Sequence, residues 1–167
     1  MSPLSRTDAS LMIALNRITS HLLHEVSLLC ARHDLTLTQF AILEALQAKG
    51  DLLVGEIQRS ILSTPGNVPY VLNNLEKKGF VLKKDVEGDR RCTRISLAPL
   101  GRERIQEVLP EHDALLEELF GVLSLGQRKA LLESLLAFRK GLGLEGRQEE
   151  KKRITKNHGI NDGKDEM

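Results

Sequence analysis

The spacing of apolar residues along this chain changes from a helical period to a strand period and back again. The first apolar stripe, with steps of three and four residues, is Leu11, Leu15, Ile18, Leu22, Val26 and Leu29. The whole pattern predicts, in chain order, helices at 8–32 and 36–49, a short apolar segment at 52–54, helices at 55–62 and 66–79, strands at 80–84 and 93–97, and helices at 99–123 and 125–142. We therefore expect a mainly α-helical protein with one small β-hairpin.

Several of the predicted helix ends carry their own signals. Asp8 or Thr7 is suited to cap the first helix and Gly50 to end the second. Pro99 suits the first position of the fifth helix, and Ser124 suits the cap of the sixth. The Ser-Thr-Pro-Gly sequence at 63–66 is typical of a turn, and it precedes the fourth helix.

The order of these elements predicts a winged helix-turn-helix. Two closely connected helices followed by a hairpin form this fold, which offers the second helix to the major groove of DNA and the hairpin, called the wing, to the backbone or minor groove. We expect one unit at 1–144, with the winged module at about 36–98 and dimerisation helices at about 8–32 and 99–142. Residues 145–167 have almost no apolar side chains and predict a disordered polar tail.

The last two predicted helices carry more apolar surface than a small winged module can cover. Their apolar residues are Leu109, Leu115, Leu116, Leu119, Phe120, Leu123, Leu131, Leu132, Leu135, Leu136 and Phe138. Packing against a second copy of the chain is the simplest way to bury these stripes. We therefore expect a homodimer.

Composition excludes several classes of protein. Aromatic residues make up only 3% of the chain, which argues against a single-strand binder that stacks bases on aromatic platforms. Two cysteines cannot form a disulfide framework, and no apolar run approaches the length of a membrane span. We expect a cytoplasmic protein that contacts no membrane. The sequence contains no glycine-rich phosphate loop or nucleophile elbow, so we expect no enzyme activity and no cofactor.

The charge is concentrated in the middle of the chain. The net charge of the whole protein is only +1, but residues 55–94 carry eight basic and five acidic side chains. Such a local excess indicates an anionic partner for the winged module, although a solvated surface explains a mild excess equally well.

The fourth predicted helix places polar residues opposite its apolar face. Val68, Leu72 and Leu75 are expected to pack inward. The opposite stripe is Asn67, Tyr70, Asn74 and Lys77, with Asn73 at its border. Asparagine can bind adenine through two hydrogen bonds in the major groove, and tyrosine and lysine can reach phosphates or bases. In the second helix of a helix-turn-helix this stripe predicts DNA contact.

The predicted hairpin tip at 85–91 holds Asp89, Arg90 and Arg91. An aspartate beside an arginine can hold its guanidinium by a charge-assisted hydrogen bond and so orient it. An oriented arginine suits a narrow minor groove, where the negative potential of DNA is strongest. We predict that these three residues contact DNA.

Over about residues 8–142 the sequence resembles the MarR family of bacterial transcription regulators. The segments that carry the resemblance are LTLTQFAILEAL, GEIQRSILSTPGNVPYVLNNLEKKGFV, the D-x-x-x-D-R-R wing and ISLAPLG. The resemblance implies a homodimeric winged helix-turn-helix, usually a repressor, that binds an inverted-repeat operator in double-stranded DNA and is released by small phenolic ligands or oxidants. It places Asp89 and Arg91 in the wing pair that orients an arginine, and Asn67, Tyr70, Asn73 and Asn74 on the recognition helix.

The sequence departs from the family pattern at four positions. Leu53 and Ala98 stand where the family often has a threonine cap, a difference worth roughly 1 kcal/mol of stability each. Pro69 replaces a common threonine and Asn74 a common arginine, so the set of base contacts is expected to differ from that of relatives.

Three kinds of signal could release such a regulator. A small organic effector in the apolar crevice between the dimer helices and the winged module is the expectation that follows from the resemblance. Redox sensing by Cys30 or Cys92 is an alternative, although we interpret both cysteines as incidental. His21 and His24 share a helical face, but we interpret them as a chance grouping and predict no metal site.

A different class of function remains open, in which the fourth helix and the wing bind a protein rather than DNA. Binding to DNA through several lysine and arginine contacts weakens steeply as salt rises, whereas a protein interface changes much less. Salt dependence therefore distinguishes the two functions.

Overall fold

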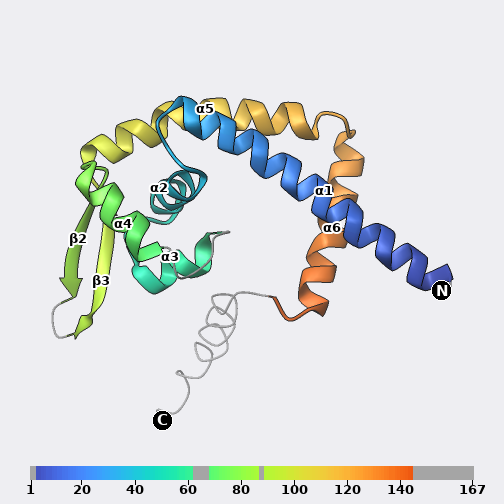
Figure 1. Cartoon of the computed structure of the whole chain (residues 1–167), viewed down its shortest axis with the longest axis horizontal. Helices are drawn as coiled ribbons and strands as arrows, with labels where there is room; N and C mark the ends of the chain where they lie inside the picture. The colour runs from blue at the N-terminus through green and yellow to red at the C-terminus, as the bar shows by residue number, and fades with distance from the viewer. Residues whose placement is uncertain (1–2, 62–67, 87–88, 145–167) are drawn as a thin grey trace, which may run out of the picture. The chain divides into compact units, whose positions relative to one another are not determined.

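The computed structural model describes residues 3–61, 68–86 and 89–144. The chain divides into two compact units, Met1–Gly121 and Val122–Met167, and each is described by itself. The first unit contains, in order, α1 (Pro3–Arg32), α2 (Leu37–Lys49), β1 (Leu52–Leu53), α3 (Val54–Ser60), α4 (Val68–Lys77), β2 (Val81–Val86), β3 (Asp89–Leu97) and α5 (Pro99–Phe120) (Figure 1). The second unit contains α6 (Leu125–Gly141). This arrangement confirms the predicted fold class, mainly α with a small winged sheet.

The sheet is antiparallel, and β3 lies between β1 and β2. Leu52 pairs with Ile95, so the short apolar segment predicted at 52–54 becomes the third strand of the wing sheet. Val81 pairs with Leu97 at the base of the hairpin, and Val86 pairs with Asp89 at its far end.

The prediction of a seven-residue loop at 85–91 is wrong. β2 continues to Val86 and β3 begins at Asp89, with an irregular register between Asp85 and Val86. Antiparallel pairing satisfies backbone N–H and C=O groups whatever the side chains are, so polar residues can extend a hairpin that composition alone marks as a loop. The backbone of Asp89, Arg90 and Arg91 is therefore strand rather than loop.

Some helix bounds differ from the predictions by two to five residues. α1 begins five residues before Asp8, with Pro3 at its first position, where a missing N–H costs no intrahelical bond. α3 ends at Ser60 because Ile61 adopts an extended conformation. α5 ends at Phe120, with Gly121 as its C-cap. The turn at 63–66, the predicted start of α4 and the tail at 145–167 lie outside the described residues.

The predicted cap of the last helix is confirmed, whereas Asp8 lies inside α1 rather than at its start. Ser124 and Gln127 form a capping box at α6, with Gln127 N–H donating to Ser124 Oγ at 3.3 Å. Ala98 offers α5 no side-chain cap. Leu53 cannot cap α3 either, but Glu56 Oε2 accepts a hydrogen bond from Leu53 N–H at 2.9 Å and so satisfies one of the free donors at this helix end.

α2 is the central helix of the first unit. Phe40, Leu43 and Leu46 are buried as predicted, and Ile42 and Ala45 are buried as well. α2 is buried around most of its circumference because α1, α3, α4, α5 and β3 all contact it. The helix-turn-helix elements are thus anchored to α1 and α5 through one shared core.

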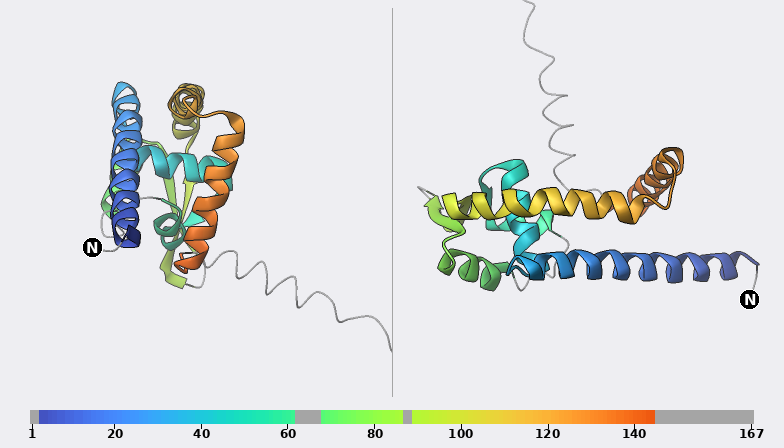
Figure 2. Two further views of the ribbon diagram at one scale, coloured as in Figure 1. Left: turned by 90° about the vertical axis from the view of Figure 1, so that its right-hand side faces the viewer. Right: turned by 90° about the horizontal axis from the view of Figure 1, so that it is seen from above.

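Large apolar surfaces remain exposed on α1 and α6. Val26 and Leu29 of the predicted α1 stripe are buried, but Leu11 and Ile18 are both 57% exposed. Figure 2 shows the N-terminal half of α1 extending away from α2, α3 and α4. On α6 no residue is buried, and its exposed apolar side chains include Leu131, Leu132, Leu135, Leu136 and Phe138.

Candidate nucleic-acid interface

α4 presents an apolar face to the core and a polar face to solvent. Its buried side chains are Val68, Val71, Leu72 and Leu75, which confirms that the apolar stripe of the fourth helix packs inward. Because α4 contacts α2, α3 and β2, its orientation relative to the wing is set by the core.

The polar face of α4 differs in one respect from its predicted stripe. Tyr70 is 66% exposed, and Asn73 and Lys77 are exposed as well. Asn74 is only half-buried rather than fully exposed, so Asn73 is the more accessible of the two amides. Asn67 lies outside the described residues. Of the predicted stripe, Tyr70, Asn73 and Lys77 are therefore the described side chains that are exposed on α4.

The end of α4 is joined rigidly to the wing. Gly79 adopts a φ of 72°, and its N–H donates to Glu76 O at 2.9 Å while Phe80 N–H donates to Leu75 O at 2.9 Å. This pair of bonds is a Schellman motif, which ends the helix and turns the chain directly into β2. The helix is therefore followed directly by the first strand of the wing, with no intervening loop.

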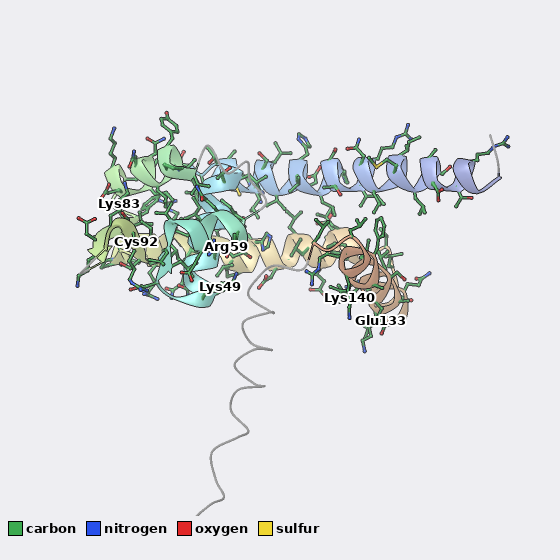
Figure 3. All side chains as sticks on the ribbon, turned by 90° about the horizontal axis from the view of Figure 1, so that it is seen from below. Lys49, Arg59, Lys83, Cys92, Glu133 and Lys140 are labelled. Atoms are coloured by element: carbon green, nitrogen blue, oxygen red, sulfur yellow. The ribbon has the colours of Figure 1, made fainter. Side chains whose placement is uncertain are left out.

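A side-chain network that sequence reasoning missed ties β2 to α4. Lys83 Nζ lies 2.8 Å from Glu76 Oε2 and also donates to Asn73 Oδ1. Figure 3 labels Lys83 beside α4. The sequence identified Lys83 only as one of eight basic residues in 55–94. Lys83 lies on a strand, ten residues from Asn73, and only the i, i+3 and i, i+4 spacings of a single helix reveal such a contact in the sequence.

Other basic side chains of this region face solvent. Those that are described and exposed are Arg59, Lys77, Lys78, Lys84 and Arg94. They are distributed over α3, α4, β2 and β3, so the local positive charge is spread across the helix-turn-helix and the wing. The side chains of Asp89, Arg90 and Arg91 lie outside the described residues, and only their backbone in β3 is placed.

A cavity of about 370 Å³ lies among α1, α2, α5 and the end of α3. Its lining is mostly apolar and comprises Leu23, Val26, Leu37, Thr38, Phe40, Ala41, Glu44, Ala45, Ala48, Lys49, Ser60, Ile61 and His112. The His112 ring packs on Phe40 with ring centroids 4.9 Å apart. His112 Nδ1 is buried without a hydrogen bond to any described residue, and Asp113 Oδ1 lies 3.9 Å away. His112 thus contributes an imidazole ring to the wall of this cavity.

The two cysteines differ in their surroundings. Cys30 is fully buried, and this burial, together with the charge of Glu44, raises the pKa of its thiol to about 11. A raised pKa keeps the thiol protonated and unreactive at neutral pH. Cys92 is half-buried on β3.

Histidine positions give no metal centre in the part of the chain that is described. His21 Nδ1 lies 3.7 Å from Glu25 Oε1 on α1, as their i, i+4 spacing allows. No three histidine, cysteine, aspartate or glutamate side chains among the described residues are grouped closely enough to hold a metal ion. None of the described helices has both the length and the apolar character needed to cross a membrane.

The sequence of this chain is similar to those of known proteins. The model of the MarR family matches residues 35–93. The HTH-type transcriptional regulator MhqR of Bacillus subtilis (strain 168) is 33% identical over 117 residues, which cover 70% of this chain and 78% of that protein.

Solved structures resemble the fold of this chain. Sco3205 of Streptomyces coelicolor, a MarR family regulator in complex with DNA, has a TM-score of 0.75 and 20% identity over 82% of this chain and 88% of that one. BpsR of Bordetella bronchiseptica has a TM-score of 0.71 and 22% identity over 77% of this chain and 98% of that one. Its structure is described as showing how 6-hydroxynicotinic acid regulates the binding of BpsR to DNA. At these identities the likeness shows the fold alone.

Proposed function

This chain belongs to the MarR family of transcriptional regulators, and on that premise we propose that it binds double-stranded operator DNA sequence-specifically as a homodimer. We propose further that it is a repressor which a small organic effector releases from DNA. Its relatives are named as transcriptional regulators, and we propose that it likewise acts by binding, without enzyme activity or a cofactor. The cytoplasm, where bacterial DNA lies, is the compartment that this function implies.

The observation that carries the proposal is the exposed polar face of α4, held rigidly beside a wing in the midst of a local positive charge. Tyr70, Asn73 and Lys77 are accessible on α4, and the core fixes this helix against β2. In a winged helix-turn-helix this helix enters the major groove. Asn67, Asn74, Asp89, Arg90 and Arg91 complete the set of residues that we propose for DNA contact.

A gel-shift titration with the promoter region of the protein's own gene tests the proposal. We expect affinity to fall about a thousandfold between about 50 and 200 mM salt, because a dimer that contacts six or more phosphates releases that many counterions. A scrambled duplex of equal length is the control for sequence specificity. Equal binding to both duplexes would contradict sequence specificity. Absent binding, or binding that hardly changes with salt, would instead favour a winged module that binds protein.

The homodimer is tested by sedimentation. We expect a stable dimer at micromolar concentration, because Leu11 and Ile18 on α1 and the apolar stripe of α6 are exposed within the described chain. Leu135→Glu is expected to dissociate the dimer, whereas Ala137→Glu, on the opposite side of α6 by helical spacing, is the matched control. A folded monomer in the wild-type protein would contradict this prediction. For the dimer, footprinting is expected to show an inverted repeat with half-site centres about 10 bp apart.

The effector is expected to bind in the cavity beside His112. A panel of small phenols and hydroxylated aromatic acids fits its volume, its apolar walls and its buried ring nitrogen. A ligand at about one hundred times its Kd is expected to raise Tm by about 5 °C or more and to release the operator. His112→Phe keeps the ring against Phe40 but removes its nitrogens, so we expect operator binding to persist and the ligand response to be lost. An unchanged response in this variant would place the effector elsewhere.

A further inference from the structure

We propose that Lys83 is a positioning residue that fixes the Asn73 amide so that Asn73 presents its NH₂ donors to DNA. This inference rests on the proposed function, and it assigns a chemical role to one contact of the recognition helix. Three described groups carry it, namely the Lys83 ammonium on β2 and the Asn73 amide and Glu76 carboxylate on α4.

The chemistry of the ammonium group decides which end of the amide faces it. A lysine ammonium has three donors and no acceptor. The Asn73 atom that binds Lys83 Nζ must therefore be the carbonyl oxygen Oδ1. The NH₂ group of Asn73 is then directed away from Lys83, and Asn73 is itself exposed on α4.

The consequence concerns what Asn73 can recognise. A free asparagine binds adenine in the major groove by donating to N7 and accepting from the N6 amino group at the same time. With Oδ1 held against Lys83 on β2, the amide is fixed in one orientation and its NH₂ donors form the end directed away from Lys83. Asn73 is then suited to donate to an acceptor atom on DNA. That acceptor is a purine N7, an oxygen at a base edge or a phosphate oxygen.

The same ammonium neutralises an acidic side chain on the proposed DNA-facing helix. Glu76 Oε2 lies 2.8 Å from Lys83 Nζ, and the Lys83 side chain is only 21% exposed. A carboxylate left unpaired on the recognition helix would repel phosphates. With two of its donors committed to α4, Lys83 acts mainly through the helix, whereas its neighbour Lys84 is exposed to solvent.

Operator affinity measured in a double-mutant cycle tests this role. The probe is the duplex that the wild-type protein enriches from a random-sequence pool, and the variants are Lys83→Met, Asn73→Ala and the double substitution. We expect Lys83→Met to weaken binding about fivefold in the wild-type background, the size of one ordinary hydrogen bond. In the Asn73→Ala background we expect a loss of about twofold or less, because only the effect of the unpaired Glu76 carboxylate remains.

Two further variants separate positioning from simple charge. Lys83→Arg keeps a donor-only cation and is expected to restore binding to within about twofold of wild type. Lys84→Met removes an exposed charge from the adjacent strand position. It is expected to lower the salt slope by about two units, roughly one for each subunit of the dimer, and to have the same effect in both Asn73 backgrounds.

Modified duplexes identify the acceptor atom. Each purine of the half-site is replaced in turn by its 7-deaza form and each phosphate by a methylphosphonate. One such change is expected to lower the operator affinity of the wild-type protein but not that of the Asn73→Ala variant. The position of that change shows whether the acceptor is a base or a phosphate. In the free protein, Lys83→Met is expected to shift the Asn73 side-chain NH₂ signals in a ¹H–¹⁵N spectrum, whereas Lys84→Met leaves them in place.

The outcomes distinguish this inference from the proposed function. Additive effects of Lys83→Met and Asn73→Ala on an enriched duplex, or unshifted Asn73 signals, overturn the positioning role and leave DNA binding intact. A pool from which no duplex is enriched overturns the proposed function and this inference together.

Discussion

Gly101→Ala is expected to lower the free energy of unfolding by about 3 kcal/mol, the upper part of the range for overpacked sites. A Cβ atom at Gly101 would lie 1.9 Å from Phe80 O and 2.8 Å from Phe80 C. These are backbone atoms that no rotamer change can move. The first turn of α5 therefore rests directly on the backbone at the start of the wing, where Phe80 O also accepts a hydrogen bond from Ala98 N–H at 3.0 Å.

Urea denaturation followed by circular dichroism measures this effect, with all variants at one protein concentration because dimerisation contributes to stability. Gly126→Ala is the matched control: it lies in the first turn of α6, and an added Cβ there meets nothing within 4 Å. It is expected to leave the midpoint unchanged or to raise it slightly. If Gly101→Ala shares the wild-type midpoint, α5 does not pack on Phe80 as closely as described. A loss of operator affinity is also expected, because Phe80 follows the glycine that ends α4.

Arg91→Ala is expected to weaken operator binding by about 1–3 kcal/mol, the range of a groove contact rather than of one screened surface charge. We propose that Asp89 orients Arg91 by a charge-assisted hydrogen bond. Asp89→Ala is then expected to weaken binding as well, although it removes a negative charge near DNA. Coulomb attraction alone predicts the opposite sign, so the direction of this change is diagnostic.

Fluorescence anisotropy with the operator duplex measures both substitutions and their combination. If Asp89 acts through Arg91, the double variant loses less than the sum of the single losses. Arg17→Ala, which removes an exposed cation from α1, is the control for a general charge effect and is expected to change affinity little. Tighter binding by Asp89→Ala, with an unchanged circular dichroism spectrum, would contradict the orienting role and leave α4 as the sole recognition element.

The elements that sequence reasoning predicted well are those whose signals are local. The second helix has Thr36 and Gln39 as a capping box and Gly50, with a φ of 77°, as its stop. Pro99 begins α5 as predicted, because a proline needs no hydrogen bond at that position. The apolar face of α4 follows in the same way from residues three and four positions apart.

The extent of the wing was not predictable in this way. Backbone pairing between Val86 and Asp89 depends on two strands meeting in register, and the polar side chains between 85 and 91 carry no signal for it. The exposure of Asn73 and the half-burial of Asn74 likewise depend on how far α4 is rotated against its neighbours.

The sequence by itself determined the order of the elements, most of their ends, the charge of the winged module and the apolar stripes that predict a dimer, because each of these depends on residues that are neighbours along the chain. Only the tertiary structure decided the contacts between distant segments. It brought Lys83 to Asn73 and Glu76, set Gly101 on the backbone of Phe80, and placed His112 against Phe40 at the wall of a cavity. Such contacts depend on how helices and strands pack in three dimensions, and a one-dimensional pattern of apolar residues states which face is buried but not which atoms it meets.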